Sequence, residues 1–321
     1  MFENIYLIFN PVSGRGDAIT ELSFIRDSLK QTPKVTVLET TPERSAGALA
    51  QEAIAQSADC LIASGGDGTV SAVAGVLFGS DIPLGIVPRG TANAIAAAFD
   101  IPSNDIDAAC QIILSGVPRK IDVATCNGEP LLLLAGIGLE ADVIEQTNRQ
   151  LKNKMGTIAY IFSAFKEVQN LSPFQATLET PDRIITVEAS GITVANAAPA
   201  TSVLAQGPSD VVPYDGLLDV AIFAPQGTGG AIAASYNLLQ TALSKRSTQR
   251  KDIGYFRCSS VKISADPAQG VVLDGEMIGD TPIDIRCFSK GLTLMTPKDG
   301  NFDPPEKLEG LPNLKIQHKE Q

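Results

Sequence analysis

One glycine-rich segment holds a carboxylate between an apolar run and a helical pattern. Ser64-Gly65-Gly66-Asp67-Gly68-Thr69 follows the apolar residues 60–63 and precedes apolar residues at helical spacing over 70–77. Glycines between a strand and a helix let the backbone approach a ligand closely, and the start of a helix attracts phosphate. Asp67 would repel a bare phosphate, but it suits a metal–phosphate complex or a hydroxyl that is to lose its proton. The segment therefore predicts phosphoryl transfer.

Two further loops combine glycine with polar side chains. Asn10-Pro11-Val12-Ser13-Gly14-Arg15-Gly16 is either a plain turn or a second phosphate loop, with Asn10 and Ser13 as polar contacts. In Pro88-Arg89-Gly90-Thr91-Ala92-Asn93, Thr91 either caps a helix over 92–98 or lies beside a nucleotide together with Asn93. The loop of residues 10–16 has neither the Gly-Lys-Ser/Thr ending of a Walker A loop nor a GxGxxG fingerprint.

Two Asp-Gly pairs occur in the second half of the chain. Asp215-Gly216 and Asp274-Gly275 are both typical of hairpin turns. In Leu273-Asp274-Gly275-Glu276, however, two carboxylates flank a glycine within an apolar stretch, and such a pair could supply a general base and a metal contact. Spacing alone favours the turn.

The first third of the chain alternates between strand and helix patterns. Strands are predicted at 5–9, 35–38, 60–63 and 84–87, and helices near 18–30, 45–55 and 70–78. This βαβ series predicts an α/β domain with a mainly parallel sheet and helices on both faces. Ligands of such sheets bind at the carboxyl ends of the strands, which is where all three glycine-rich loops fall.

After about residue 122, short strand patterns separated by turns predict a β-rich antiparallel sandwich or barrel. Two helices interrupt it, an amphipathic one over 158–168 and another near 230–243. The run 148–154 has three positive charges and is either a solvated face or a local dock for anionic headgroups. The strand patterns lie at 131–135, 176–179, 184–189, 193–195, 218–223, 261–263, 271–273 and 283–287.

Composition excludes several classes of function. The chain of 321 residues is long enough for two domains, and its net charge of -11 argues against nucleic-acid binding. The single histidine, His318, lies in a polar tail, which excludes Ser-His-Asp, Cys-His and histidine–metal mechanisms. Five dispersed cysteines, no bilayer-spanning apolar run and no signal-peptide pattern at the start of the chain predict a cytoplasmic location.

In order, the segments resemble the diacylglycerol-kinase-type catalytic domain, the superfamily of bacterial lipid kinases, sphingosine kinases and ceramide kinases. The resemblance spans residue 10 to about 297. Its motifs are Asn-Pro-x-Ser-Gly, Gly-Gly-Asp-Gly-Thr, Pro-x-Gly-Thr-x-Asn, Asp-Gly-Leu-Leu-Asp and Leu-Asp-Gly-Glu.

The resemblance implies an ATP-dependent kinase that phosphorylates a lipid hydroxyl, with diacylglycerol the favoured kind of substrate. A nucleotide-binding α/β domain would span 1–122 and a β-rich lipid-binding domain 123–288. The segment 289–321 would pack back on the first domain and end in a polar tail. Contact with the membrane surface would be peripheral and transient, and the region 152–168 resembles the family helix beside the lipid entrance.

The resemblance also assigns roles to individual residues. Asp67 would organise the magnesium–ATP complex, and Glu276, with Asp274 beside it, matches the acceptor of the hydroxyl proton. Asp215 and the carbonyls of Val212 and Leu217 match a structural magnesium site. The nucleotide contacts would be Asn10, Ser13, Gly14, Thr40, Gly65, Gly66, Asp67, Gly68, Thr69, Val70, Ser71 and Thr91.

The chain departs from the family pattern at one position. Ala94 stands where many bacterial members have an acidic residue. The missing carboxylate leaves open a sensor that binds nucleotide or lipid without catalysis. Independently of Ala94, an NAD-kinase-like enzyme is a second alternative, since that family shares a Gly-Gly-Asp-Gly loop.

Overall fold

The chain forms two compact units. The first consists of Met1–Val123 and Lys290–Gly300, and the second of Ala124–Ser289 and Asn301–Gln321. The sequence placed these boundaries near 122 and 288 and assigned 289–321 to one returning segment. The computed structural model describes residues 2–14, 16–30, 34–139, 173–198, 205, 211–244, 248, 250–297, 311 and 313–318.

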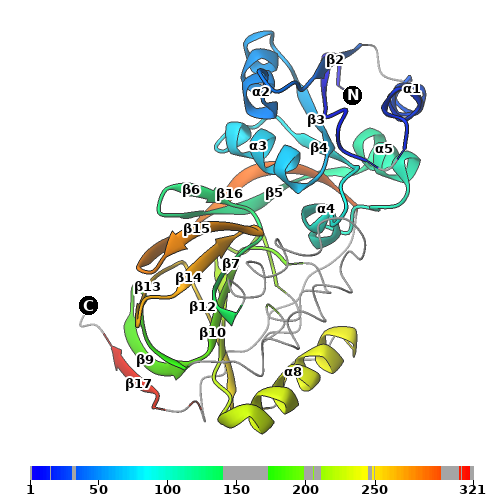
Figure 1. The fold of residues 1–321 in the computed structure, drawn as a ribbon. Helices are drawn as coiled ribbons and strands as arrows, with labels where there is room; N and C mark the ends of the chain where they lie inside the picture. The colour runs from blue at the N-terminus through cyan, green and yellow to red at the C-terminus, as the bar shows by residue number, and fades with distance from the viewer. Residues whose placement is uncertain are drawn as a thin grey trace. The chain divides into compact units, whose positions relative to one another are not determined.

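A parallel sheet forms the centre of the first unit (Figure 1). Its strands are β1 (Ile5–Phe9), β2 (Val35–Glu39), β3 (Cys60–Gly65) and β4 (Leu84–Pro88), in the order β4-β3-β1-β2. Every residue of β1, β3 and β4 is buried, as expected for central parallel strands that have both faces covered. The end of β16 (Ile283–Thr296) extends this sheet, since Leu294 pairs in parallel with Leu84.

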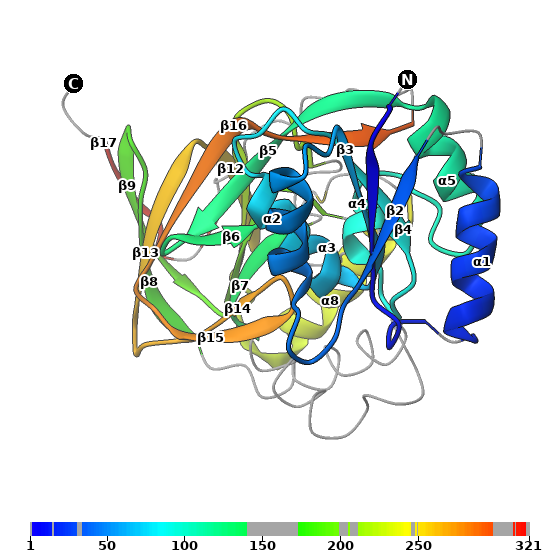
Figure 2. The ribbon, with the colours of Figure 1, turned by 90° about the horizontal axis from the view of Figure 1, so that it is seen from above.

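Helices cover both faces of this sheet (Figure 2). α1 (Ala18–Ser28) and α5 (Ile106–Ser115) lie on one face, where Ile25 and Ile113 share a core with β1 and β3. α2 (Ala46–Ala55) and α3 (Asp67–Leu77) lie on the other. The predicted α/β fold with a mainly parallel sheet is confirmed, although the sequence reasoning did not include α5 or β5 (Val117–Cys126).

Side-chain caps set the starts of α1, α2 and α5, and in α5 the Asp105 carboxylate accepts the Ala108 N–H at 2.9 Å. The Asp17 carboxylate accepts the Thr20 N–H at 2.8 Å, and Ser45 Oγ accepts the Ala48 N–H at 3.2 Å. The hydrogen bond from the Thr20 hydroxyl, together with that N–H, lowers the pKa of Asp17. With Asp17 as its N-cap, α1 begins directly after the glycine-rich segment 10–16 that follows β1.

The second unit is a sandwich of two antiparallel sheets, as predicted. One sheet has the order β17-β9-β8-β13-β16, and β6 joins it through the end of β5; the other has the order β12-β11-β10-β7-β14-β15. Apolar side chains from both sheets, such as Leu178, Val187, Val194 and Val220, form one core between them. The strands not yet given bounds are β6 (Glu129–Leu131), β7 (Leu134–Gly138), β8 (Phe174–Glu179), β9 (Arg183–Ala189), β10 (Gly191–Ala195), β11 (Leu218–Phe223), β12 (Ile253–Cys258), β13 (Ser260–Asp266), β14 (Gly270–Leu273), β15 (Glu276–Asp280) and β17 (Lys315–His318).

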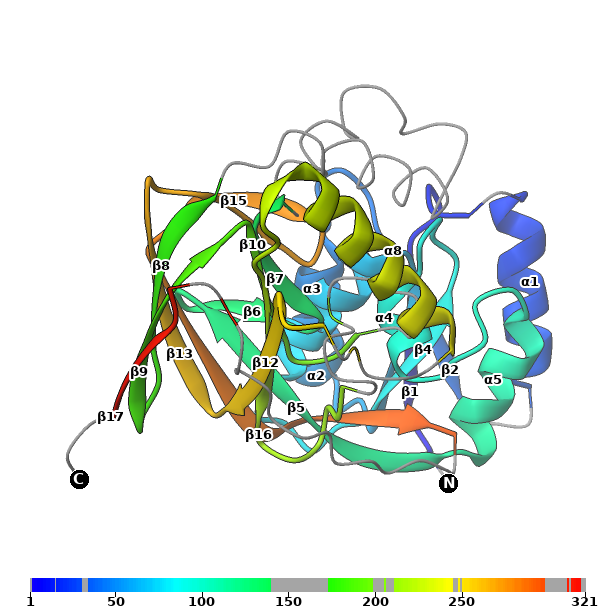
Figure 3. The same cartoon turned by 90° about the horizontal axis from the view of Figure 1, so that it is seen from below.

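Two predictions about the later part of the chain have different outcomes. The helix expected near 230–243 is α8 (Gly227–Ser244), which is visible in Figure 3. The helix expected over 158–168 and the basic run 148–154 lie outside the described residues.

Among the described helices, none combines the length and the apolar character needed to cross a membrane. β17 pairs with β9, so this end of the chain belongs to the second unit.

Candidate functional site

Backbone hydrogen bonds hold the loops of the first unit together at the carboxyl ends of the strands. The Asn10 N–H donates to the Ser64 carbonyl at 2.9 Å, and the Arg89 N–H donates to the Gly65 carbonyl at 2.8 Å. The Thr40 N–H donates to the Phe9 carbonyl at 2.9 Å. The segments that the sequence singled out after β1, β2, β3 and β4 therefore lie along one edge of the sheet.

The glycines at this edge have two different roles. A Cβ at Gly65 would lie 2.4 Å from Thr69 Oγ1, and one at Gly90 would lie 2.6 Å from the Gly66 Cα. These glycines are required because the loops pack tightly against each other. A Cβ at Gly68, in contrast, would have no atom within 4 Å. Among the glycines of this segment, Gly68 is the one that faces open space.

Asp67 begins α3 and stabilises a second helix. One carboxylate oxygen accepts the Ile95 N–H at 2.9 Å, in the first turn of α4 (Ala94–Ala98). The N–H groups of Asp67 and Gly68 make no hydrogen bond within the described part of the chain. Such groups at a helix start bind anions readily, so this end of α3 can hold a phosphate.

The helix predicted over 92–98 with Thr91 as its cap is corrected by the structure. α4 starts at Ala94, and its N-cap is Asn93, which has a left-handed backbone with φ of 50°. Asparagine tolerates this conformation better than threonine does. The Asn93 side chain closes the loop by accepting the Gly90 N–H at 2.7 Å and donating to the Gly90 carbonyl at 3.0 Å. Thr91 is exposed.

The remaining predicted nucleotide contacts differ in what they offer a ligand. Asn10 Nδ2 donates to Thr69 Oγ1 at 3.1 Å, and this bond links the first loop to the second. Thr40 and Ser71 are half-buried, whereas the Val70 side chain is buried in the core and leaves only its backbone for a ligand. Ser13 and Gly14 lie beside Arg89, a residue to which the sequence reasoning gave no role.

In the second unit, Asp274 and Gly275 form the two-residue turn between β14 and β15. Both have positive φ, at 47° and 92°, which fits a type I′ hairpin. The Asp274 carboxylate accepts the N–H groups of Leu132, Leu133 and Leu134 at 2.9, 2.9 and 3.0 Å. The carboxylate thus holds the backbone of residues 132–134 beside this turn. Glu276 is exposed at the start of β15, where its backbone pairs with Leu273, and its carboxylate has no hydrogen bond or ion pair within the described residues.

Asp215, which the family resemblance assigns to a structural magnesium site, contacts Leu217 and Arg257 in the structure. One Asp215 oxygen accepts the Leu217 N–H at 3.0 Å, and the other forms an ion pair with the Arg257 guanidinium. Arg257 Nε also lies 3.5 Å from the buried Asp219 carboxylate. Arg257 thus supplies a positive charge beside Asp215, and the magnesium site of this carboxylate with the carbonyls of Val212 and Leu217 stays a prediction.

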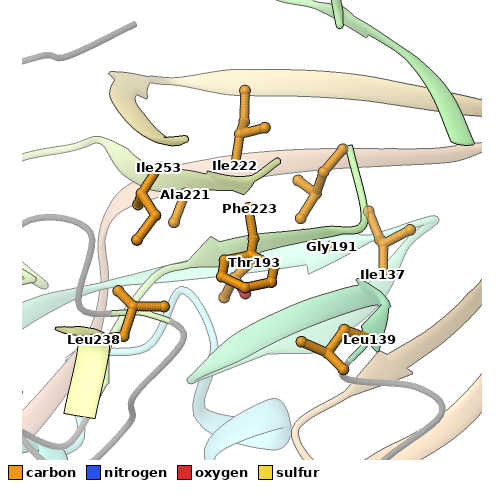
Figure 4. A pocket seen from close by; sticks show the side chains of 10 residues that line it. Ile137, Leu139, Gly191, Thr193, Ala221, Ile222, Phe223, Leu238 and Ile253 are labelled. Carbon is orange, nitrogen blue, oxygen red and sulfur yellow. The ribbon is translucent and has the colours of Figure 1, made fainter. Parts of the chain in front are cut away.

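Two hollows of the second unit do not suit a lipid chain. The first, of about 10 Å³, has room for about one water molecule. Apolar side chains of β7, β10, β11, β12 and α8 line it, among them Phe223 and Leu238 (Figure 4). The second is larger, at about 390 Å³, but charged and polar side chains such as Lys262, Glu179 and Asp284 line it.

Thiol chemistry is disfavoured at the four buried cysteines. Burial raises the pKa of Cys60, Cys110 and Cys258 to about 12 and that of Cys126 to about 11. All five cysteines are free thiols. A thiolate nucleophile would therefore be scarce at neutral pH.

Comparisons with known proteins agree with this arrangement. The family model of the diacylglycerol kinase catalytic domain matches residues 4–126, and that of the YegS C-terminal NAD kinase beta sandwich-like domain matches residues 134–296. A diacylglycerol kinase of Bacillus subtilis (strain 168) is 28% identical over 298 residues, which cover 91% of this chain and 96% of the relative. An uncharacterized protein of Synechocystis sp. is 40% identical over 307 residues, which cover 92% of this chain and 71% of the relative.

Solved structures give the same result. A Bacillus anthracis (strain Sterne) protein, provisionally described as a diacylglycerol kinase, superposes with a TM-score of 0.77 at 27% identity. The match covers 92% of this chain and 97% of that one. The chain therefore belongs to the diacylglycerol kinase family and is a lipid kinase.

Proposed function

We propose that this kinase transfers the γ-phosphate of ATP to a primary hydroxyl of a membrane lipid such as diacylglycerol. The observation that supports this most is the start of α3. There, Asp67 and Gly68 have N–H groups without hydrogen-bond partners in the described residues, next to open space above Gly68. A triphosphate needs such donors, because positioning and charge stabilisation provide most of the acceleration in phosphoryl transfer.

The nucleotide would bind at the edge of the parallel sheet, within the domain 1–122. Residues 65–71 would surround the phosphates, mainly through backbone N–H groups, with further contacts from Asn10, Ser13, Gly14, Thr40 and Thr91. Asp67 keeps one carboxylate oxygen for the metal, since the other accepts the Ile95 N–H. The magnesium ion that accompanies ATP would neutralise charge on the phosphates.

The proton of the lipid hydroxyl would pass to Glu276 rather than to Asp274. The Asp274 carboxylate accepts three backbone N–H groups. Both of its oxygens, one of which would have to take the proton, are therefore already engaged in hydrogen bonds. Glu276 is exposed at the start of β15, two residues away, and its carboxylate is accessible. The proton goes to Glu276 as the hydroxyl oxygen attacks the γ-phosphorus and ADP leaves.

The lipid would bind to the β-rich domain 123–288. Of the segment 289–321, which the sequence assigned to the first domain, only 290–300 belongs to the first unit, and 301–321 belongs to the second. The enzyme would work in the cytoplasm and contact the membrane surface only peripherally and transiently. These statements rest on the family, whose substrates are membrane lipids.

The test is transfer of radiolabelled phosphate from magnesium–ATP into mixed micelles of diacylglycerol, phosphatidylglycerol, ceramide, sphingosine or monoacylglycerol, with NAD as a further acceptor. We expect one labelled lipid, no labelled NAD phosphate, no product without magnesium, and about 10³-fold slower labelling with Asp67→Asn. Asp100→Asn is the matched control, because Asp100 is exposed with φ of 55°, a conformation that asparagine tolerates. Labelled NAD phosphate and no labelled lipid would refute the lipid assignment.

A further inference from the structure

Arg89 occupies an unusual position for an arginine. It directly follows β4, and its side chain is 1% exposed. Its backbone N–H donates to the Gly65 carbonyl at 2.8 Å, so its main chain is bound to the segment that precedes α3. A buried guanidinium is costly unless nearly every N–H has a partner.

The guanidinium of Arg89 binds the loop that follows β1. Nη1 donates to the Asn10 carbonyl at 2.9 Å, and Nη2 donates to the Ser13 carbonyl at 2.7 Å. The guanidinium carbon also lies 4.1 Å from the centre of the Phe9 ring, within range of a cation–π contact. The one side chain thus holds the end of β1 and both ends of the turn 10–13.

Glu21 of α1 supplies the counter-charge. Its Oε2 lies 2.6 Å from Arg89 Nε and 2.6 Å from Nη2, in a fork geometry that a lysine cannot reproduce. The neighbouring glycines make room for this pair. A Cβ at Gly14 would lie 2.9 Å from Glu21 Oε2, and one at Gly16 would lie 2.7 Å from Oε1. These two glycines therefore accommodate the ion pair, and Gly14 has a φ of 109° as well.

The orientation of the loop carbonyls matters for an anionic ligand. Carbonyl oxygens repel phosphate, while N–H groups attract it. Arg89 binds the carbonyl oxygens of Asn10 and Ser13, and Asn10 in turn donates its side-chain amide to Thr69 at the start of α3. Loss of Arg89 would release both carbonyls and loosen the link between the first loop and α3.

We infer that Arg89, with Glu21, is a positioning residue that fixes the loop of residues 10–14 in the conformation that binds the phosphates of ATP. It acts through that loop and does not touch the substrate, because its side chain is buried. The inference rests on the proposed ATP-binding function. It predicts that Arg89 governs ATP affinity and not lipid affinity.

The test uses Arg89→Lys and Glu21→Gln, which preserve side-chain size better than truncation does. Binding of magnesium–ATP is measured by calorimetry, and KM for ATP, KM for the lipid and kcat are measured with the active lipid. Loss of the bidentate charge-assisted bonds should weaken ATP binding and raise KM for ATP by about tenfold in each variant, with KM for the lipid unchanged.

Arg44→Lys is the matched control. Arg44 and Glu52 form an ion pair with the same 2.6 Å separation in the same unit, but their side chains are 48% and 40% exposed. We expect no change in ATP binding in this variant. Circular dichroism and thermal denaturation show whether each variant is folded.

The outcomes separate the inference from the proposed function. ATP affinity equal to wild type in folded Arg89→Lys and Glu21→Gln would overturn the inference and leave the kinase assignment intact. Equal losses of ATP and lipid affinity would also overturn it, since they would indicate a general structural role. A wild-type protein that binds no ATP would overturn both.

Discussion

The two units use the same residue pair in opposite ways. Asp67-Gly68 in the first unit and Asp274-Gly275 in the second each join an acidic residue to a glycine after a buried strand. Asp67 gives one oxygen to the N–H of Ile95 and lies at the start of a helix. Asp274 gives its carboxylate to three N–H groups and lies in a hairpin turn.

The two residues are both aspartates, so residue type does not separate a reactive carboxylate from a structural one. What separates them is how many hydrogen bonds from the backbone each carboxylate already accepts. A carboxylate that accepts several backbone N–H groups contributes to stability, and its removal leaves those donors without a partner. A carboxylate with one remaining oxygen beside unbonded helix N–H groups can interact with a ligand. Substitutions at the two positions should therefore separate activity from stability.

The largest effect is expected at Asp67. Asp67→Asn should lower kcat by about 10³-fold, because the neutral amide loses the charge proposed to organise magnesium–ATP. The melting temperature should stay close to that of wild type, since the asparagine oxygen can still accept the Ile95 N–H. Phosphate transfer and thermal denaturation on the same preparation measure both quantities. Activity near that of wild type in the folded variant would remove Asp67 from the mechanism.

The opposite result is expected at Asp274. Asp274→Ala should reduce the free energy of unfolding by about 3 kcal/mol, because three N–H groups lose their acceptor. Denaturant unfolding measures this loss. Asp280→Ala is the matched control, because Asp280 is an exposed carboxylate at the other end of β15. Equal stability of the two variants would contradict a structural role for Asp274.

Glu276 lies two residues from Asp274, and we expect it to resemble Asp67 in behaviour. Glu276→Gln should lower kcat by about 10²-fold through loss of a proton acceptor, while unfolding stays unchanged because the side chain is exposed. Glu129→Gln, at an exposed position of β6, is the control for the loss of a surface charge. Steady-state rates at saturating ATP and lipid provide the measurement. A variant with wild-type kcat would exclude Glu276 as the base.

The comparison also shows which features the sequence could predict. Continuous apolar runs such as Ile5–Phe9 predicted the parallel strands, because central strands with two covered faces contain few polar residues. The Asp274-Gly275 turn was equally predictable from its residues. A sequence pattern is sufficient where interactions between residues that are close in the sequence determine the structure.

Long-range partners were beyond the reach of sequence patterns. Asp274 binds residues about 140 positions away, and Arg89 binds Glu21 68 positions away. The ion pair of Asp215 with Arg257 likewise depends on the pairing of β11 with β12. The sequence therefore could not show that Arg257 pairs with Asp215, while the role of Asp215 as a metal ligand stays a prediction.

The smallest effect is expected at a carboxylate of the second unit that faces solvent. The side-chain hydrogen bond from Arg286 holds the pKa of Asp284 below its usual value, and the charges of Arg286 and Lys262 act in the same direction. Because the pKa of Asp284 is lower in the folded state than in the unfolded state, its ionised form stabilises the folded protein. This contribution is complete above the unfolded-state pKa of about 3.9 and is lost as pH falls through the folded-state pKa. Because Arg286 is 59% exposed, solvent screens the pair, and Arg286→Gln should cost less than about 1 kcal/mol at pH 7.

The pH dependence of this small effect distinguishes charge from packing. Urea unfolding of wild type and Arg286→Gln at pH 7 should differ slightly. The difference should shrink as pH falls below about 4, where Asp284 becomes protonated in the unfolded state, and should vanish once pH is below the lowered pKa of Asp284 in the folded state. High salt at pH 7 should shrink it too. A difference that persists at low pH and in high salt would mean that the arginine stabilises β16 through its hydrocarbon stem. The contribution of the Arg286–Asp284 contact would then come from packing of the arginine, whereas that of Asp274 comes from the N–H groups that its carboxylate accepts.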